Sequence, residues 1–138
     1  MKTVPQILQD SKTIAIVGLS TNPERASHGV AHYLQQHGYR IVPVNPTYAG
    51  QDILGEKVYS SLQEAADALA ASGERIDIVD CFRKSEEMLP VAREAVAVGA
   101  RCLWMQMGVV NQAAADLAAA AGLDVVMDQC IKVQHASL

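Results

Sequence analysis

The sequence predicts an α/β fold, a Rossmann-like three-layer sandwich with a mainly parallel sheet of five or six strands. Short apolar runs rich in β-branched residues alternate along the chain with longer segments whose apolar residues are three and four positions apart. Half of the residues are hydrophobic but only 4% are aromatic, which suits helices packed on a valine-rich sheet. Because the apolar runs are continuous, we expect strands buried on both faces, as in parallel sheets.

The expected elements follow one another in a regular order, beginning with a short helix at residues 5–9. Strands are expected at residues 13–18, 40–44, 76–80, 101–106 and 124–127, with helices at 26–37, 61–71, 86–98 and 112–121. A glycine follows each of these four helices, Ser61 and Glu64 form a capping-box pattern, and Asn111 is expected to be an N-cap. Segment 48–59 is long for a connection and is expected to add a short edge strand.

Length and charge limit the classes of protein. A chain of 138 residues is the size of one domain, so residues 1–138 are expected to form a single unit. The net charge is −4 and the basic residues are scattered singly, which argues against a nucleic-acid partner. No apolar run approaches the ~18 residues of a membrane span, and the N-terminus does not resemble a secretory signal. We therefore expect a cytoplasmic protein that does not bind membranes.

The predicted topology places a ligand crevice at the carboxyl ends of the strands, where strand order reverses. The two loops expected there are residues 18–27 and 80–83. In the first loop, Gly18 permits a tight turn and the following helix start offers free N–H groups to an anion. Ser20 and Pro23 stand where the dinucleotide fingerprint has glycines. The alternative is a plain strand-to-helix turn capped by Ser20 or Ser27.

The end of the second strand indicates which nucleotide could bind. NAD sites usually have an acidic residue there to hold the ribose, whereas this chain has Asn45 between Val44 and Pro46. NAD is therefore disfavoured. The prolines at 43 and 46 fix an extended segment that can lie against an adenine ring, although a rigid turn alone also explains them.

Several motifs together resemble a known family. They are Pro23 five residues after Gly18, PVNP at 43–46, VDCFR at 79–83, LWMQMG at 103–108 and DQC at 128–130. In this combination the chain is similar to the stand-alone coenzyme A-binding proteins, which resemble the N-terminal CoA-binding domain of the succinyl-CoA synthetase α subunit. The resemblance covers about residues 6–132. It implies a Rossmann-type domain that binds CoA or an acyl-CoA.

The resemblance also implies a set of binding residues. The phosphates would meet Gly18, Ser20, Asn22 and Arg25, with Ser27 close behind; Val44, Asn45 and Pro46 would lie beside the adenosine, and Phe82 and Arg83 would flank the nucleotide. Gln106 and Gly108, which end the fourth predicted strand, are placed to line the crevice. A helix start and the guanidinium groups of Arg25 and Arg83 would complement the phosphates despite the negative net charge.

No complete catalytic constellation is present. His28 and His32 are one helical turn apart but lack the glutamate of a zinc motif, and Asp80 and Asp128 serve equally well as bases or as caps. The synthetase's phosphorylated histidine and nucleotide-activating domain belong to regions that have no counterpart here. We therefore expect a binding protein that acts as a sensor or carrier through an unknown protein partner. The alternative classes are an NAD(P)-binding oxidoreductase-like protein and a regulatory protein without a nucleotide.

The three cysteines are an odd number without metal-ligand spacing, so neither a disulfide framework nor a metal site is expected. Cys102 lies inside a predicted strand, whereas Cys130 and Cys81 are expected just beyond strand ends on the ligand rim. A CoA thiol could there exchange with Cys130 or Cys81, which would make a CoA-linked thiol redox protein. Buried, inert thiols are the alternative. The alanine-rich helix 112–121 is a candidate homodimer face or simply packs on the sheet.

Overall fold

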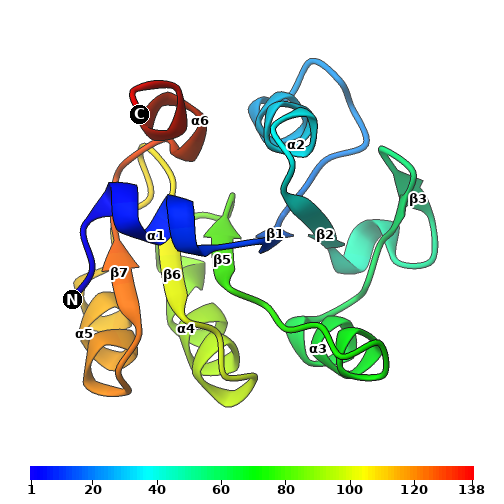
Figure 1. The fold of residues 1–138 in the computed structure, drawn as a ribbon. Coiled ribbons are helices and arrows are strands. Elements are labelled where there is room, and N and C mark those ends of the chain that lie inside the picture. The colour runs from blue at the N-terminus through cyan, green and yellow to red at the C-terminus, as the bar shows by residue number, and fades with distance from the viewer.

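A computed structural model describes residues 1–138 and has a five-stranded, entirely parallel sheet with helices on both sides (Figure 1). The strand order is β2-β1-β5-β6-β7. The strands are β1 (Thr13–Val17), β2 (Arg40–Val44), β5 (Ile78–Cys81), β6 (Cys102–Met105) and β7 (Asp124–Val126). The predicted Rossmann-like α/β fold is confirmed. Strand β1 lies between β2 and β5, which is the predicted reversal of strand order.

Helices cover the two faces of the sheet in two layers. One layer contains α1 (Val4–Asp10), α2 (Ala26–Gln36) and α6 (Ile131–Ala136), and the other contains α3 (Leu62–Ala70), α4 (Met88–Ala97) and α5 (Gln112–Ala120). Successive strand residues alternate between these layers: Ile14 and Ile16 pack with the first, Ala15 and Val17 with the second. Both faces are buried, which explains the continuous apolar runs. No helix is long and apolar enough to cross a membrane.

The structure corrects several details. Segment 48–59 adds only an isolated parallel bridge, Tyr59 with Val44, at the edge where a short strand was expected. It also contains an antiparallel pair, β3 (Asp52–Ile53) with β4 (Glu56–Lys57), which forms its own two-stranded sheet. A short 3₁₀ helix, η1 (Pro46–Tyr48), precedes that pair, and another, η2 (Ser85–Glu87), forms the start of predicted helix 86–98. Helix α6 is not in the predicted set.

The predicted caps are confirmed in part. Asn111 caps α5, and glycines with positive φ follow α2, α3, α4 and α5. Ser61 accepts a hydrogen bond from the Glu64 N–H, but the reciprocal half of the predicted capping box is absent. The Glu64 carboxylate accepts the Ser60 hydroxyl at 2.8 Å instead. The capping box is incomplete because the Glu64 carboxylate accepts from the Ser60 hydroxyl and not from the Ser61 N–H.

Candidate functional site

Two loops meet above the point where strand order reverses. The loop after β1 begins at Gly18, where φ is +88° and a Cβ would lie 2.2 Å from the carbonyl oxygen of Phe82. Only glycine fits both the backbone conformation and this close approach. The Phe82 N–H in turn donates to the Val17 carbonyl at 2.9 Å. The loops after β1 and β5 are thus held against each other, as the predicted crevice requires.

The loop after β1 is shaped by its own hydrogen bonds. The Ser20 N–H donates to Ser27 Oγ and the Asn22 N–H donates to Ser20 Oγ, both at 3.0 Å. Neither serine is the N-cap of α2. Arg25 occupies that position without a side-chain hydrogen bond. The expected N-cap role of Ser20 or Ser27 is therefore wrong, although both serines stabilise the turn, and the first N–H groups of an eleven-residue helix are left without a capping side chain.

A polar cavity of about 340 Å³ lies at this helix start. Its lining combines the loop after β1, the start of α2, the segment after β2 and the loop after β5. The lining residues are Gly18, Ser20, Arg25, Ala26, Ser27, Asn45, Thr47, Tyr48, Phe82 and Arg83. A positive helix end and two arginines make this cavity suited to an anion such as a phosphate.

Asn45 joins two walls of the polar cavity. Its Nδ2 donates to the Leu19 carbonyl, and its Oδ1 accepts from the Thr47 N–H, both at 3.0 Å. The second bond caps η1 and places Thr47 and Tyr48 on the lining. An asparagine suits this position because one side chain supplies both a donor and an acceptor.

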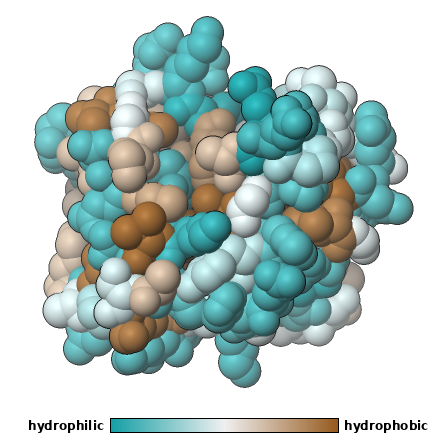
Figure 2. Space-filling view, turned by 90° about the horizontal axis from the view of Figure 1, so that it is seen from above, coloured by the Kyte–Doolittle hydropathy of each residue, from teal (hydrophilic) through white to brown (hydrophobic).

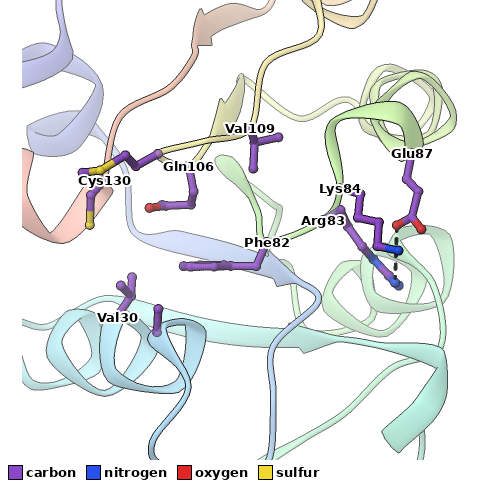
Figure 3. A pocket seen from close by; sticks show the side chains of 10 residues that line it. Val30, Phe82, Arg83, Lys84, Glu87, Gln106, Val109 and Cys130 are labelled. Carbon is purple, nitrogen blue, oxygen red and sulfur yellow. Dashed lines mark ion pairs between the residues drawn. The ribbon is translucent and has the colours of Figure 1, made fainter.

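A larger cavity of about 680 Å³ adjoins the polar one and shares Ala26, Phe82 and Arg83 with it (Figure 3). The remaining lining residues are Val30, Lys84, Glu87, Gln106, Met107, Val109 and Cys130. Arg83 lies 4.0 Å from Glu87 at the edge of this cavity. Figure 2 shows the molecule from above the view of Figure 1, so that the carboxyl ends of β5 to β7 point toward the reader. On this face, hydrophobic patches interrupt a largely hydrophilic surface. The volume is within the range of small-molecule sites.

Beside this cavity, Gln106 Nε2 donates to Oδ1 of Asp80, a carboxyl group that is fully buried. The second oxygen, Oδ2, has no hydrogen-bond partner. Burial raises the pKa of Asp80 to about 7, and hydrogen bonds from the Gln106 side chain and the Cys81 backbone offset part of this effect. Asp80 is the third residue of β5 and so lies inside the strand. The other predicted acid, Asp128, accepts the Gly108 N–H at 2.7 Å.

The cysteines do not share one environment. Cys130 is partly exposed and lines the larger cavity, as predicted. The placement of Cys81 on the rim is wrong: it is the last residue of β5, its side chain belongs to the core on the α4 side, and burial raises the pKa of its thiol well above the usual range. Cys102 is buried, as expected. No group of three or more His, Cys, Asp or Glu side chains could hold a metal ion.

Most of the predicted binding residues come together, but four lie outside the linings of both cavities. Val44 is 3% exposed and packs in the core that α3 covers, so its side chain does not face the crevice. Pro46 and Asn22 are exposed beside the polar cavity. Gly108 lies between two lining residues, Met107 and Val109, and is itself outside the lining.

The structure adds lining residues that the sequence reasoning missed. On the polar side these are Ala26, which also lines the larger cavity, and Thr47 and Tyr48, which the Asx-type turn at Asn45 could have indicated. On the larger side they are Val30, Lys84, Glu87, Met107 and Val109. The apolar members are indistinguishable from core residues in a sequence, because apolar positions line cavities and cores alike.

Fold and crevice together define a Rossmann-like α/β protein with two adjoining cavities at the carboxyl end of a parallel sheet, where ligands bind in folds of this kind. Residues 12–136 match the family described as the CoA binding domain, and the chain belongs to that family. It is 45% identical over 133 residues to the uncharacterized protein YneT of Bacillus subtilis (strain 168), over 96% of this chain and 92% of that protein.

Solved structures from thermophiles have the same fold over almost the whole chain. Cell-free ID.343 from Thermus thermophilus superposes with a TM-score of 0.88 at 32% identity, covering 97% of this chain and 95% of that chain. A hypothetical protein from Pyrococcus horikoshii OT3 gives 0.86 at 36% identity, covering 98% and 89%. The predicted resemblance to stand-alone CoA-binding proteins is thereby confirmed.

Proposed function

We propose that residues 1–138 form one CoA-binding domain, which binds coenzyme A or an acyl-CoA without catalysing a reaction and acts as a sensor or carrier. The observation that carries the proposal is the pair of adjoining cavities with unlike linings. The polar cavity would take the phosphates and adenosine, and the larger cavity would take the arm that ends in the thiol or thioester. CoA is a long ligand with a charged end and a less polar end, so it matches this division.

The positive charge around the polar cavity supports placing the phosphates and adenosine of the ligand there. Arg25 and Arg83 line it, no acidic residue does, and the start of α2 adds a partial positive charge. Asn45 stands where an NAD site usually has a carboxylate, which favours a nucleotide that carries an additional ribose phosphate.

The proposal is tested by calorimetry and thermal shifts with CoA, acetyl-CoA, longer acyl-CoAs and NAD. We expect CoA or an acyl-CoA to bind and to raise the melting temperature, because a ligand that binds only the folded state stabilises it. The ligand released on denaturing freshly purified protein gives an independent answer. Stabilisation by NAD alone would overturn the proposal and favour the NAD(P)-binding alternative.

Arg25→Ala tests the position of the phosphates. We expect CoA affinity to fall about fivefold and its salt dependence to weaken, because one charge-assisted hydrogen bond is lost. Arg93→Ala is the matched control, since Arg93 is also exposed on a helix but lines neither cavity. Equal affinities for the two variants would place the phosphates elsewhere.

A further inference from the structure

Asp80 is an unusual residue for the interior of this sheet. Its neighbours in register are Ile16 on β1 and Trp104 on β6, both fully buried and apolar. The side chain is 0% exposed, and one of its two carboxyl oxygens has no hydrogen-bond partner. A buried polar atom without a partner costs about 1 to 3 kcal/mol, so such a residue calls for a specific reason to be there.

The side-chain hydrogen bond between Gln106 and Asp80 determines how Gln106 is oriented. Because Oδ1 accepts from Gln106 Nε2, the amide nitrogen is turned toward the strand and the carbonyl oxygen is turned away from it. Figure 3 shows that this oxygen points into the space bounded by Cys130, Val30 and Phe82. If Asp80 takes up a proton, the free Oδ2 is available to hold it, and Oδ1 can continue to accept from Gln106.

The carbonyl oxygen of Gln106 therefore points into a part of the cavity whose walls are mostly apolar. Val30, Phe82 and Val109 supply much of the surrounding surface, and the charged groups of Arg83, Lys84 and Glu87 lie together on the other side of the cavity (Figure 3). A hydrogen-bond acceptor in apolar surroundings selects a ligand group that donates. The arm of CoA carries two amide N–H groups along an otherwise flexible chain.

We propose that Asp80 is a positioning residue that holds the Gln106 carbonyl oxygen toward the larger cavity, where it accepts a hydrogen bond from an amide N–H of the ligand's arm. The inference rests on the proposed function and adds to it the part of the ligand that is recognised there. Gln106 contacts the ligand, and Asp80 acts only through Gln106. A carboxylic acid is suited to this task because either of its protonation states provides an acceptor.

The test compares CoA with adenosine 3′-phosphate 5′-diphosphate, which has the same phosphates and adenosine but no arm. Calorimetry is carried out on the full chain and on the variants Gln106→Leu, Asp80→Ala and the double variant. We expect Gln106→Leu to weaken CoA binding about five- to tenfold, the loss of one buried hydrogen bond, and Asp80→Ala to weaken it by a similar or smaller factor. The double variant should be no weaker than Gln106→Leu alone, because the two residues act through one contact.

The affinity of each variant for the armless nucleotide should stay within about twofold of the affinity of the unmodified chain, since the polar cavity is unchanged. Asp80→Asn is the conservative variant: its amide oxygen can accept from Gln106, so CoA affinity should return toward that of the unmodified chain. It also keeps the proposal testable if Asp80→Ala does not fold.

The outcomes separate this inference from the proposed function. Independent, multiplying losses in the double variant, or an equal loss for the armless nucleotide, would overturn the positioning role of Asp80. The same holds if CoA binds Gln106→Leu as tightly as the unmodified chain. Failure of the unmodified chain to bind either CoA or the armless nucleotide would instead overturn the proposed function.

Discussion

Two carboxylates at opposite ends of strand β5 have very different surroundings. At the amino end, Asp77 accepts the N–H groups of Lys12 and Thr13 through one oxygen, at 2.9 and 3.0 Å, and its other oxygen lies 3.9 Å from Arg101 Nε. At the carboxyl end, Asp80 accepts a single side-chain hydrogen bond, from Gln106 to Oδ1, and its Oδ2 has no partner. Both residues are largely buried, at 8% and 0% exposure.

This difference indicates a structural role for Asp77 and a role at the candidate site for Asp80, three residues later in the sequence. The partners of Asp77 hold the start of β1 and the start of β6 to the segment before β5, so its charge is used to join strands. The side-chain partner of Asp80, Gln106, lines the larger cavity. Buried polar groups that lack full satisfaction gather at functional sites, and here the candidate site lies at the carboxyl end.

Asp77→Ala should have the largest effect on stability. Removing the carboxylate leaves two backbone N–H groups without their acceptor, and we expect a loss of about 2 to 4 kcal/mol in the free energy of unfolding. Denaturant titration measures this loss, and calorimetry should find CoA affinity unchanged in protein that remains folded. Asp77→Asn keeps an acceptor oxygen and should cost less than about half as much. Equal losses for the two variants would contradict a role through hydrogen bonding.

Gly18→Ala should have the next largest effect and should act at the carboxyl end alone. The new methyl group collides with the Phe82 carbonyl and the backbone keeps a positive φ, so we expect a loss of about 2 to 3 kcal/mol in stability. The displaced Phe82 lines both cavities, so CoA affinity should fall as well.

Gly99→Ala is the matched variant at the amino end of the sheet. Its φ is +73°, but a Cβ there would meet nothing within 4 Å, so only the backbone strain of about 1 kcal/mol remains. CoA affinity should not change. If both variants lose the same stability and neither loses affinity, contact between the two loops is unimportant for binding.

The sequence was sufficient to predict the sheet and its crevice. Continuous β-branched runs placed every strand within about two residues, because burial on both faces leaves little freedom in such segments. The hairpin of β3 and β4 and the helix α6 were missed. Two-residue strands give no alternation to detect, and the six residues of α6 include Lys132, Gln134 and His135, which weaken an apolar pattern.

The site was predictable only where local chemistry marks it. Gly18, Arg25 and Asn45 were found because a tight turn, a charge and a missing carboxylate are visible in the sequence. Cys81 was misplaced because a shift of one residue at the end of β5 turns a rim position into a core position. The unsatisfied oxygen of Asp80 could not be foreseen, since it depends on what the two neighbouring strands, β1 and β6, place around it.

The last of these effects concerns how stability depends on pH, and Asp80→Asn isolates it. The pKa of Asp80 is raised to about 7 in the folded protein, whereas an unfolded chain releases this proton near pH 4. Between these values the folded state binds more protons, so stability should fall as pH rises, by at most about 1.4 kcal/mol per pH unit, and level off above pH 7. Asp80→Asn cannot titrate and lacks this contribution.

Denaturant titrations at pH 5, 6, 7 and 8 measure the difference between the unmodified chain and Asp80→Asn, which cancels the titration of all other groups. We expect the difference to change by about 2 kcal/mol from pH 5 to pH 7 and to stay constant above that. Asp77→Asn, measured in the same way, tests whether the effect belongs to one end of β5. Parallel curves for the unmodified chain and Asp80→Asn would mean that Asp80 is ionised throughout, which requires a partner for Oδ2 and removes the contrast between the two carboxylates.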